Sequence, residues 1–244
     1  MLERSFALVL GSRRKNRLLA ALPGEILSSV EPHLKDISLS RGTVLCDADR
    51  PLSHVYFVEA GAVSLVTIFE NGATAEMATI GREGMVGVDT LLGSEQALGR
   101  YMVSVAGSAL AVEAGRFRSA LRESPTLRAT CDVYAQSFFA HLLQNVACNA
   151  SHRVEQRCAR WLLMCGDQTD DDTVELTQEY LAEMLGVRRS TITDIACAFQ
   201  KTGLIRYRRG TVTVLDRRGL ETAACECYRI VRNRYEQLPA RAVG

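Results

Sequence analysis

The chain has 244 residues, of which 47% are hydrophobic, and its formal net charge at pH 7 is +1. This length allows one large domain or two ordinary domains, each with a core of its own. No apolar run reaches the eighteen or more residues of a membrane span, and the start MLERSFALVLGSRRKNRLL lacks the order of a secretory signal, so we expect a cytoplasmic protein. Its eight cysteines should then be reduced thiols, and they form no CxxC pair and no zinc-finger spacing with histidine.

The first half of the chain changes from a helical to a strand-like pattern. Residues 1 to about 35 read as helical, with a break at Pro23-Gly24-Glu25. Six short β-like runs follow, at 44–45, 55–58, 63–68, 75–80, 102–105 and 109–112. Turn signals separate them, among them Ala60-Gly61 and a strong hairpin signal at Asn71-Gly72. Many short strands at regular spacing predict a barrel or jelly roll.

A long helix is expected from Pro125 to about residue 150. One apolar stripe at helical spacing consists of Leu127, Cys131, Tyr134, Phe138, Leu142 and Asn145. A second, adjacent stripe consists of Phe139, Leu143 and Val146. A helix that is apolar on two sides needs two partners, its own β-domain and another surface, for which a second copy of the chain is the obvious candidate. We assign the first stripe to a dimer interface; the alternative is a core helix in a monomer.

The segment after this helix is expected to be a hinge, at Cys148 to His152. Ser151 can cap the next helix, 154–164, and an acidic loop follows at 166–173. Near the end of the chain, residues 220–238 read as one basic amphipathic helix. Cys225 and Cys227 would diverge by about 200° on such a helix, so no shared metal is expected there.

The stretch LTQEYLAEMLGVRRSTITDIACAFQKTGLI, residues 176–205, predicts two short helices joined by a tight turn. Thr177 is a good N-cap, and Gly186 can end the first helix with a positive φ. The second helix opens at Arg188, and its buried stripe should be Ile192, Ile195, Ala196 and Phe199. Polar side chains then point outward near its amino end, where phosphate and base-edge contacts need arginines and hydroxyls.

A basic hairpin follows the two helices in RYRRGTVTVLD. Helix, turn, helix and a basic β-hairpin together predict a winged helix, whose arginines would lie on phosphates beside the groove. From Gly186 to Arg234 there are eleven basic and four acidic residues, a local net charge of +7. The candidate DNA-binding residues are Thr177, Gln178, Arg188, Arg189, Ser190, Thr191, Thr193, Asp194, Arg206, Arg208 and Arg209.

A β-roll, a long helix, a hinge and a winged helix, in that order, resemble the Crp/Fnr family of bacterial transcription regulators. The resemblance covers roughly residues 18–230, and LTQEYLAEMLGV followed by STITDIACAFQKTGLI is its most specific part, with RGTVLCDADRPLSHVYFVEAGAVSLV and GREGMVG in the roll. It implies an α+β chain with a sensory roll at 1–124, a dimerisation helix and hinge at 125–150, and a winged helix-turn-helix at 151–244. It also implies a homodimer on a two-fold symmetric operator, with one recognition helix per half-site.

The resemblance assigns roles to individual residues of the recognition helix. Arg189 matches the leading arginine that reads guanine, and Ser190 and Thr193 match the next base-facing positions. Thr177 and Gln178 match phosphate-contacting positions at the start of the first helix. Asp194 departs from the cyclic-AMP receptor branch, which has a second arginine there, so the half-site should differ.

The roll departs from that branch more strongly. Gly84-Met85-Val86-Gly87 stands where a Gly-Glu pair would hold the ribose, and Tyr101 follows Arg100 where serine is expected. We therefore expect a signal other than cyclic AMP, with Met85, Val86, Gly87, Arg100 and Tyr101 as a possible effector pocket. An iron–sulfur cluster is set aside because no cysteine precedes Cys46. The lone histidines His33, His54 and His141 read as structural rather than as haem ligands, so no cofactor is assigned.

Two other classes of function remain as alternatives. In one, the roll binds a small molecule and the helical domain contacts proteins rather than DNA. An enzyme is the other, but the chain has no nucleophile elbow, P-loop or HExxH motif. The acidic loop Asp167 to Asp172 matches the place where the cyclic-AMP receptor touches RNA polymerase, which makes the polymerase a possible partner.

Overall fold

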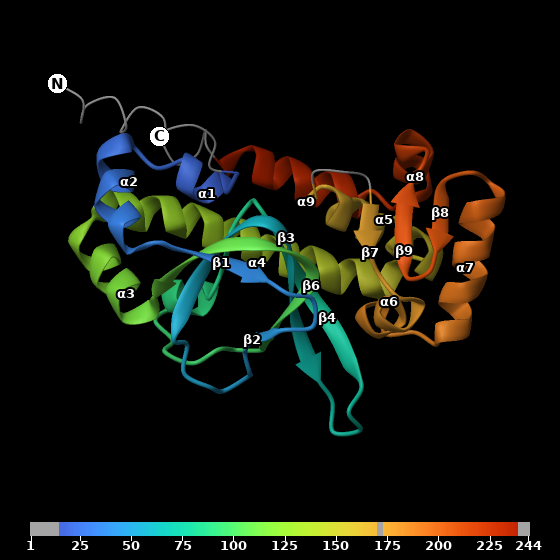
Figure 1. Ribbon diagram of the computed structural model, residues 1–244, viewed down its shortest axis with the longest axis horizontal. Coiled ribbons are helices and arrows are strands. Elements are labelled where there is room, and N and C mark those ends of the chain that lie inside the picture. Colours follow the sequence, from blue (N-terminus) through green and yellow to red (C-terminus); the bar gives the residue numbers. More distant parts are fainter. Residues whose placement is uncertain (1–14, 170–172, 239–244) are drawn as a thin grey trace.

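The computed structural model describes residues 15–169 and 173–238 (Figure 1). The chain opens with two short helices, α1 (Arg17–Ala20) and α2 (Gly24–Val30), and a 3-10 turn η1 (Glu31–His33). Pro23 precedes α2 directly, so the expected break lies where the sequence placed it. The part of the helical prediction that falls on residues 1–14 lies outside the described residues.

The roll is a six-stranded antiparallel sheet in the order β1-β6-β3-β4, with β2 paired to β6 and β5 paired to β3. Its strands are β1 (Lys35–Leu39), β2 (Val44–Cys46), β3 (His54–Ile68), β4 (Thr74–Ile80), β5 (Met85–Val86) and β6 (Arg100–Glu113). The 3-10 helix η2 (Val88–Leu92) lies between β5 and β6. This arrangement confirms the predicted roll.

Two long bent strands replace four of the predicted short ones. The Ala60-Gly61 signal marks an irregularity inside β3, because the pairing of β3 with β6 shifts register between Val58 and Val63. Gly61 has φ +80°, and a Cβ there would lie 2.5 Å from the carbonyl oxygen of Val105. Glycine therefore serves a β-bulge here, not a turn. Asn71-Gly72 does form the predicted hairpin turn between β3 and β4.

The long helix is α4 (Pro125–Ser151), which follows α3 (Ala114–Glu123) and begins at a cap in which the Ser124 hydroxyl accepts from the Leu127 amide. It runs along the roll, and α9 (Cys227–Glu236) packs beside it (Figure 1).

The assignment of the first apolar stripe to the dimer interface is wrong. Within the single chain, five of its six side chains are buried and the sixth is half-buried: Leu127, Cys131, Tyr134, Phe138, Asn145 and, half-buried, Leu142. The Tyr134 hydroxyl donates to the Met85 carbonyl at 3.1 Å, and the Asn145 amide donates to the Met77 carbonyl at 2.7 Å. This stripe is therefore covered by the roll and by α9.

The second stripe is the exposed one. Phe139, Leu143 and Val146 are 62%, 56% and 69% exposed and lie on one face of α4 at spacings of four and three residues. Large apolar side chains on one exposed helix face need a partner surface.

The second domain is a winged helix. Its elements are α5 (Val154–Gly166), β7 (Thr173–Glu175), α6 (Gln178–Leu185), α7 (Arg189–Lys201), β8 (Ile205–Arg208), β9 (Thr211–Val214) and α8 (Arg217–Ala223), with the sheet order β7-β9-β8. Ser151 does not cap α5 as expected, since α4 continues through it. Arg153 is the N-cap, and Gln156 accepts from its amide. The segment 170–172 of the acidic loop lies outside the described residues.

The tail is two helices instead of the single helix expected at 220–238. Helix α8 ends at Ala223, and Ala224 has extended backbone angles before α9 begins at Cys227. The break has a packing reason, because α8 packs on α5 whereas α9 packs on α4. One straight helix could not follow both surfaces. No helix in the described parts of the chain is long and apolar enough to cross a membrane.

Candidate nucleic-acid interface

The helix pair forms through the local signals in its sequence. The Thr177 hydroxyl accepts from the Tyr180 amide at 3.2 Å, and Gly186 ends α6 with φ +65°. The Val187 amide then donates to the Ala182 carbonyl, which closes the turn. The predicted buried stripe of α7 is confirmed, with Ile192, Ile195, Ala196 and Phe199 all buried. The opposite face of α7 is therefore free to contact another molecule.

The amino end of α7 carries the exposed polar side chains that a groove-reading helix needs. Arg188, Arg189, Ser190 and Asp194 are exposed. The Arg189 Nε atom lies 3.6 Å from Glu179 Oε2, and these side chains are 66% and 64% exposed. An ion pair this exposed contributes little to stability, so Arg189 can exchange Glu179 for another acceptor. The unpaired amides of the first turn add positive potential at the same place.

Four of the predicted contact residues are partly engaged within the chain: Thr177, Gln178, Thr191 and Thr193. The Thr193 hydroxyl donates to Gln178 Oε1 at 2.8 Å, which ties α7 to α6, and Thr191 is half-buried. Thr177 faces the roll, where Arg41 donates to its hydroxyl at 3.4 Å and stacks over the Tyr180 ring at 5.0 Å. Sequence reasoning missed Arg41, because nothing local connects it with Thr177, which lies 136 residues later.

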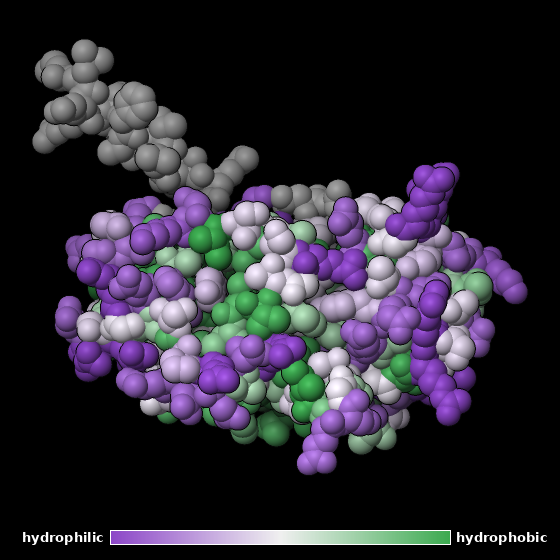
Figure 2. All heavy atoms as spheres, turned by 60° about the horizontal axis from the view of Figure 1, so that its bottom comes forward, coloured by the Kyte–Doolittle hydropathy of each residue, from purple (hydrophilic) through white to green (hydrophobic). Residues whose placement is uncertain are grey.

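The wing is the predicted hairpin. Arg209 and Gly210 form a two-residue turn with φ +51° and +76° between β8 and β9, and Arg206, Arg208 and Arg209 are exposed. Helix α7 and the wing lie at the same end of the molecule (Figure 1). Figure 2 shows hydrophilic side chains over that end, whereas hydrophobic side chains reach the surface mainly in the middle of the face shown.

Most of the residues expected to form an effector pocket are buried within the roll. Met85 and Val86 are fully buried in strand β5, and Tyr101 is fully buried as well. The Tyr101 hydroxyl donates to the buried Asp89 carboxylate at 2.6 Å, and burial raises the pKa of Tyr101 well above its usual value. Arg100 is paired with Asp47 at 2.6 Å. The assignment of these residues to an effector pocket stays a prediction.

The buried His141 has a structural environment. Burial lowers its pKa to about 3, so the ring is neutral, and its Nδ1 lies 3.3 Å from the Tyr235 hydroxyl. The ring also packs edge-on against Phe138. This position joins α4 to α9 and fits the structural role expected of it.

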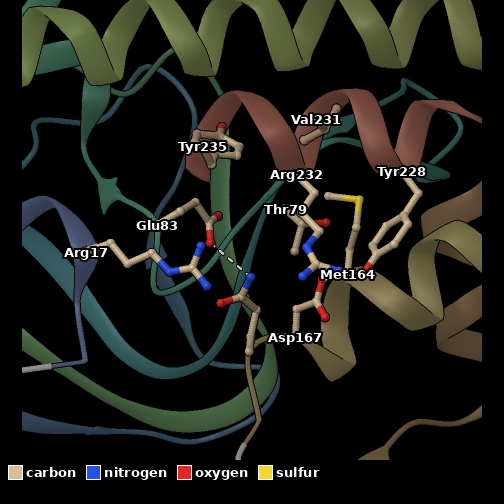
Figure 3. A pocket seen from close by; sticks show the side chains of 10 residues that line it. Arg17, Thr79, Glu83, Met164, Asp167, Tyr228, Val231, Arg232 and Tyr235 are labelled. Carbon is tan, nitrogen blue, oxygen red and sulfur yellow. Dashed lines mark hydrogen bonds between the residues drawn. The ribbon is translucent and has the colours of Figure 1, made fainter. Parts of the chain in front are cut away.

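A cavity of about 100 Å³ lies where the roll, α5 and α9 meet (Figure 3). Arg17, Glu83, Asp167 and Arg232 are among its lining residues, and Figure 3 shows Arg17 pointing toward Glu83. The volume is below the roughly 300 Å³ at which pockets for drug-sized ligands begin. We therefore describe this region as the seam between the two domains.

Gln168 fastens one side of this seam. Its backbone carbonyl accepts from the Gly61 amide at 3.0 Å, and its side-chain oxygen accepts from the Arg82 amide at 2.7 Å. Its side-chain nitrogen donates to Glu83 Oε2 at 2.9 Å, the bond dashed in Figure 3. A Cβ on Gly81 would lie 2.1 Å from Gln168 Cδ, so the first glycine of GREGMVG makes room for this side chain.

Glu76 of β4 fastens the other side. Its carboxylate accepts from the indole N–H of Trp161 at 2.7 Å and from the Ser64 hydroxyl. The carboxyl is buried, and burial raises its pKa. Roll residues Ala62, Val66 and Val105 join the core of the winged helix, so the two domains pack as one body.

Four side chains that the sequence did not associate meet at the hinge: Cys148, His152, Cys225 and Cys227. The expected single tail helix separated Cys225 from Cys227. The turn between α8 and α9 instead places both beside the end of α4.

Comparisons with known proteins match both halves of the chain. The model of the cyclic nucleotide-binding domain matches residues 36–124, and the model of the Crp-like helix-turn-helix domain matches residues 156–223. A search of curated proteins finds no match.

Solved structures with a similar fold include several regulators. A transcriptional regulator of the Crp/Fnr family from Eubacterium rectale is 18% identical with a TM-score of 0.65, over 86% of this chain and 99% of that chain. FixK2 from Bradyrhizobium japonicum is 15% identical with a TM-score of 0.61, over 79% and 98%. The c-di-GMP responsive global regulator CLP from Xanthomonas campestris is 16% identical with a TM-score of 0.59, over 80% and 100%. At these identities the likeness shows the fold.

Proposed function

Because this chain belongs to the Crp/Fnr family of transcription regulators, we propose that it binds DNA sequence-specifically as a homodimer and regulates transcription. The observation that carries the proposal is the amino end of α7, where Arg188, Arg189 and Ser190 are exposed beside a basic wing. An α-helix fits the major groove, and its first turn is the part that reaches base edges in helix-turn-helix proteins.

We assign a role in DNA binding to each of these residues from its position in the domain. Arg189 is the base reader, since its guanidinium leaves the weak pair with Glu179 and can bond a guanine edge in bidentate fashion. Asp194 lies in the second turn of α7 and, as an acceptor, favours a cytosine amino group. Arg206, Arg208 and Arg209 of the wing contact phosphates, which adds affinity but no sequence preference.

The homodimer would form through Phe139, Leu143 and Val146 of α4. These are large apolar side chains exposed on one face of the helix, while the adjacent stripe is covered by the chain itself. Pairing this face with its copy would align two α4 helices and place two α7 helices for adjacent half-sites of a two-fold symmetric operator. The partner we propose for this face is a second copy of the chain.

The signal would act through the seam between roll and winged helix. Met85 and the Tyr101–Asp89 pair fill the part of the roll that the sequence marked as a pocket, which supports a signal other than cyclic AMP. Contact with RNA polymerase through the acidic loop stays a prediction. Asp167 is already bonded to Arg217 and to the Tyr228 hydroxyl, and residues 170–172 lie outside the described residues.

The test starts from a site selected from random DNA by the purified protein. Arg189→Ala should weaken the binding free energy for that site by about 1–3 kcal/mol and relax the preference at one base position. Arg208→Ala should instead weaken binding to all sequences similarly, and should reduce the slope of log affinity against log salt concentration by about one. Arg229→Ala, an exposed arginine on α9, is the matched control and should change neither quantity. Equal behaviour of the Arg189 and Arg208 variants would contradict the assigned roles.

The dimer surface is tested separately. Leu143→Glu should shift the protein from dimer to monomer in sedimentation velocity, because a charge would be buried at the interface. Glu155→Ala, an exposed change on α5, is the control and should leave the dimer intact. A dimer that survives Leu143→Glu would place the interface elsewhere.

A further inference from the structure

Three cysteines and a histidine from two segments far apart in the sequence converge at the hinge. Cys148 and His152 come from the last turn of α4 and the residue that follows it, and Cys225 and Cys227 flank the turn between α8 and α9. The ligand atoms of the four side chains all lie within 4.8 Å of one another. The three cysteines are buried and form a small cluster of their own.

Two of the distances between these atoms match those between ligands around one ion. Cys148 Sγ lies 3.5 Å from Cys225 Sγ, and Cys227 Sγ lies 3.5 Å from His152 Nδ1. Tetrahedral zinc with Zn–S of about 2.3 Å and Zn–N of about 2.0 Å separates its ligands by about 3.5–3.8 Å. An iron–sulfur cluster distributes its cysteines over several irons, which requires a wider group. A disulfide would join two sulfurs at about 2.05 Å and would not involve the other two side chains of the group.

The partners around the group are those that orient metal ligands. His152 presents Nδ1 to Cys227, while its Nε2 lies 3.3 Å from Glu226 Oε1. A carboxylate on the far nitrogen fixes the ring and its tautomer, as in carboxylate–histidine–zinc arrangements. The Gln144 amide donates to Cys227 Sγ at 3.0 Å, which stabilises a thiolate.

The charges around these four side chains also favour a bound divalent cation. Three thiolates around a divalent cation leave one negative charge in a buried place. Arg160, which is itself buried, attracts Cys148 and Cys225, and Arg157 interacts with the same two sulfurs. The Nε atoms of both arginines are buried without a hydrogen-bond partner in the described structure. Two cations held at this point offset the excess negative charge of a loaded site.

We propose that Cys148, His152, Cys225 and Cys227 bind one zinc ion, which fastens the end of the long helix to the turn between α8 and α9. Four protein ligands fill the tetrahedral coordination, so the site is structural and has no open position for chemistry. Because the site joins the end of α4 to the turn between α8 and α9, the bound zinc fixes the angle at which the winged helix leaves α4. The ligands must lose their protons, so loading releases protons and depends on pH.

Metal content of the full-length protein tests the proposal. Protein purified under reducing conditions should carry about one zinc per chain, and Cys148→Ser and Cys225→Ser should each lower this at least tenfold. Cys46→Ser, which changes a cysteine of the roll, is the matched control and should keep full loading. The cobalt-substituted protein should show the thiolate charge-transfer and visible bands of a tetrahedral site.

Two further measurements separate a lost ligand from a misfolded variant. Cys227→His keeps a ligand atom and should retain zinc, whereas Glu226→Ala keeps all four ligands and should weaken zinc binding about ten- to a hundredfold. For the wild type, a chelator should lower the thermal midpoint and added zinc should restore it, with no response in Cys225→Ser. Wild-type protein that is folded and metal-free with the same midpoint with and without zinc overturns the proposal. Bound iron–sulfur, or a Cys148–Cys225 disulfide in protein purified with zinc, also overturns it.

Discussion

Gly81→Ala should undock the winged helix from the roll. Gly81 does not adopt a positive φ, so its backbone tolerates alanine, but the new Cβ would lie 2.1 Å from Gln168 Cδ. Two atoms cannot approach this closely, and the flexible Gln168 side chain must leave its place. The substitution thus acts on the seam and not on the strand that carries it.

The magnitude follows from the hydrogen bonds that Gln168 would lose. The bond from the Arg82 amide, at 2.7 Å, is worth about 0.5–1.5 kcal/mol, and the bond to the Glu83 carboxyl, at 2.9 Å, about 1.5–3 kcal/mol when that group is charged. Alanine also lowers the conformational entropy of the unfolded chain, which stabilises the folded protein by about 0.4–1 kcal/mol and offsets part of this loss. The net loss in the free energy of unfolding should be about 1–4 kcal/mol.

A double-mutant cycle measures this loss. The single tryptophan, Trp161, is hydrogen-bonded across the seam to Glu76, so its fluorescence follows docking during urea unfolding at fixed protein concentration. Gln168→Ala alone should cost a similar amount, and adding Gly81→Ala to it should cost little more. Gly24→Ala, with nothing within 4 Å of its Cβ, is the control and should be nearly neutral. Additive costs for Gly81→Ala and Gln168→Ala would refute the argument.

Three other substitutions test separate parts of the structure. Burial raises the pKa of Glu76, so the wild type loses stability as pH rises from about 4.5 through the pKa of the folded state. Glu76→Gln should remove this loss. If the free energies of unfolding of the wild type and the variant, measured in urea between about pH 4 and 7, change with pH in parallel, the argument is contradicted. Tyr101→Phe leaves a buried Asp89 oxygen without its donor and should lower the free energy of unfolding by about 1–3 kcal/mol in the same assay. An unchanged unfolding midpoint would contradict this and would mean that water replaces the hydroxyl. Thr177→Ala removes the cap of α6 and should cost about 1 kcal/mol, with Thr177→Ser as the control that keeps it.

Local signals determined much of this protein. The cap at Thr177, the positive φ of Gly186 and the buried stripe of α7 depend on residues a few positions apart, so the helix pair could be predicted from the sequence alone. The same holds for the turn at Asn71-Gly72 and for the wing at Arg209-Gly210, where the turn needs positive φ. The order of these patterns along the chain then sufficed to predict the fold class.

Only the tertiary structure decided which surface each pattern faces. Both stripes of α4 are apolar, and periodicity cannot tell which one the roll and α9 cover; Tyr134 and Phe138 proved to be inside and Phe139 outside. Likewise, the sequence does not show where the Tyr101 ring lies, whereas in the structure the ring is buried and its hydroxyl donates to Asp89. These choices depend on contacts between segments far apart in the sequence.

The hinge shows the same limit. A helical pattern at 220–238 separated Cys225 from Cys227, and only the competing surfaces of α5 and α4 break it into α8 and α9. Cys148 then meets Cys225 across 77 positions of sequence. The sequence fixes local conformation through neighbouring residues, but the side chains that share a site are selected by packing, which involves the whole chain.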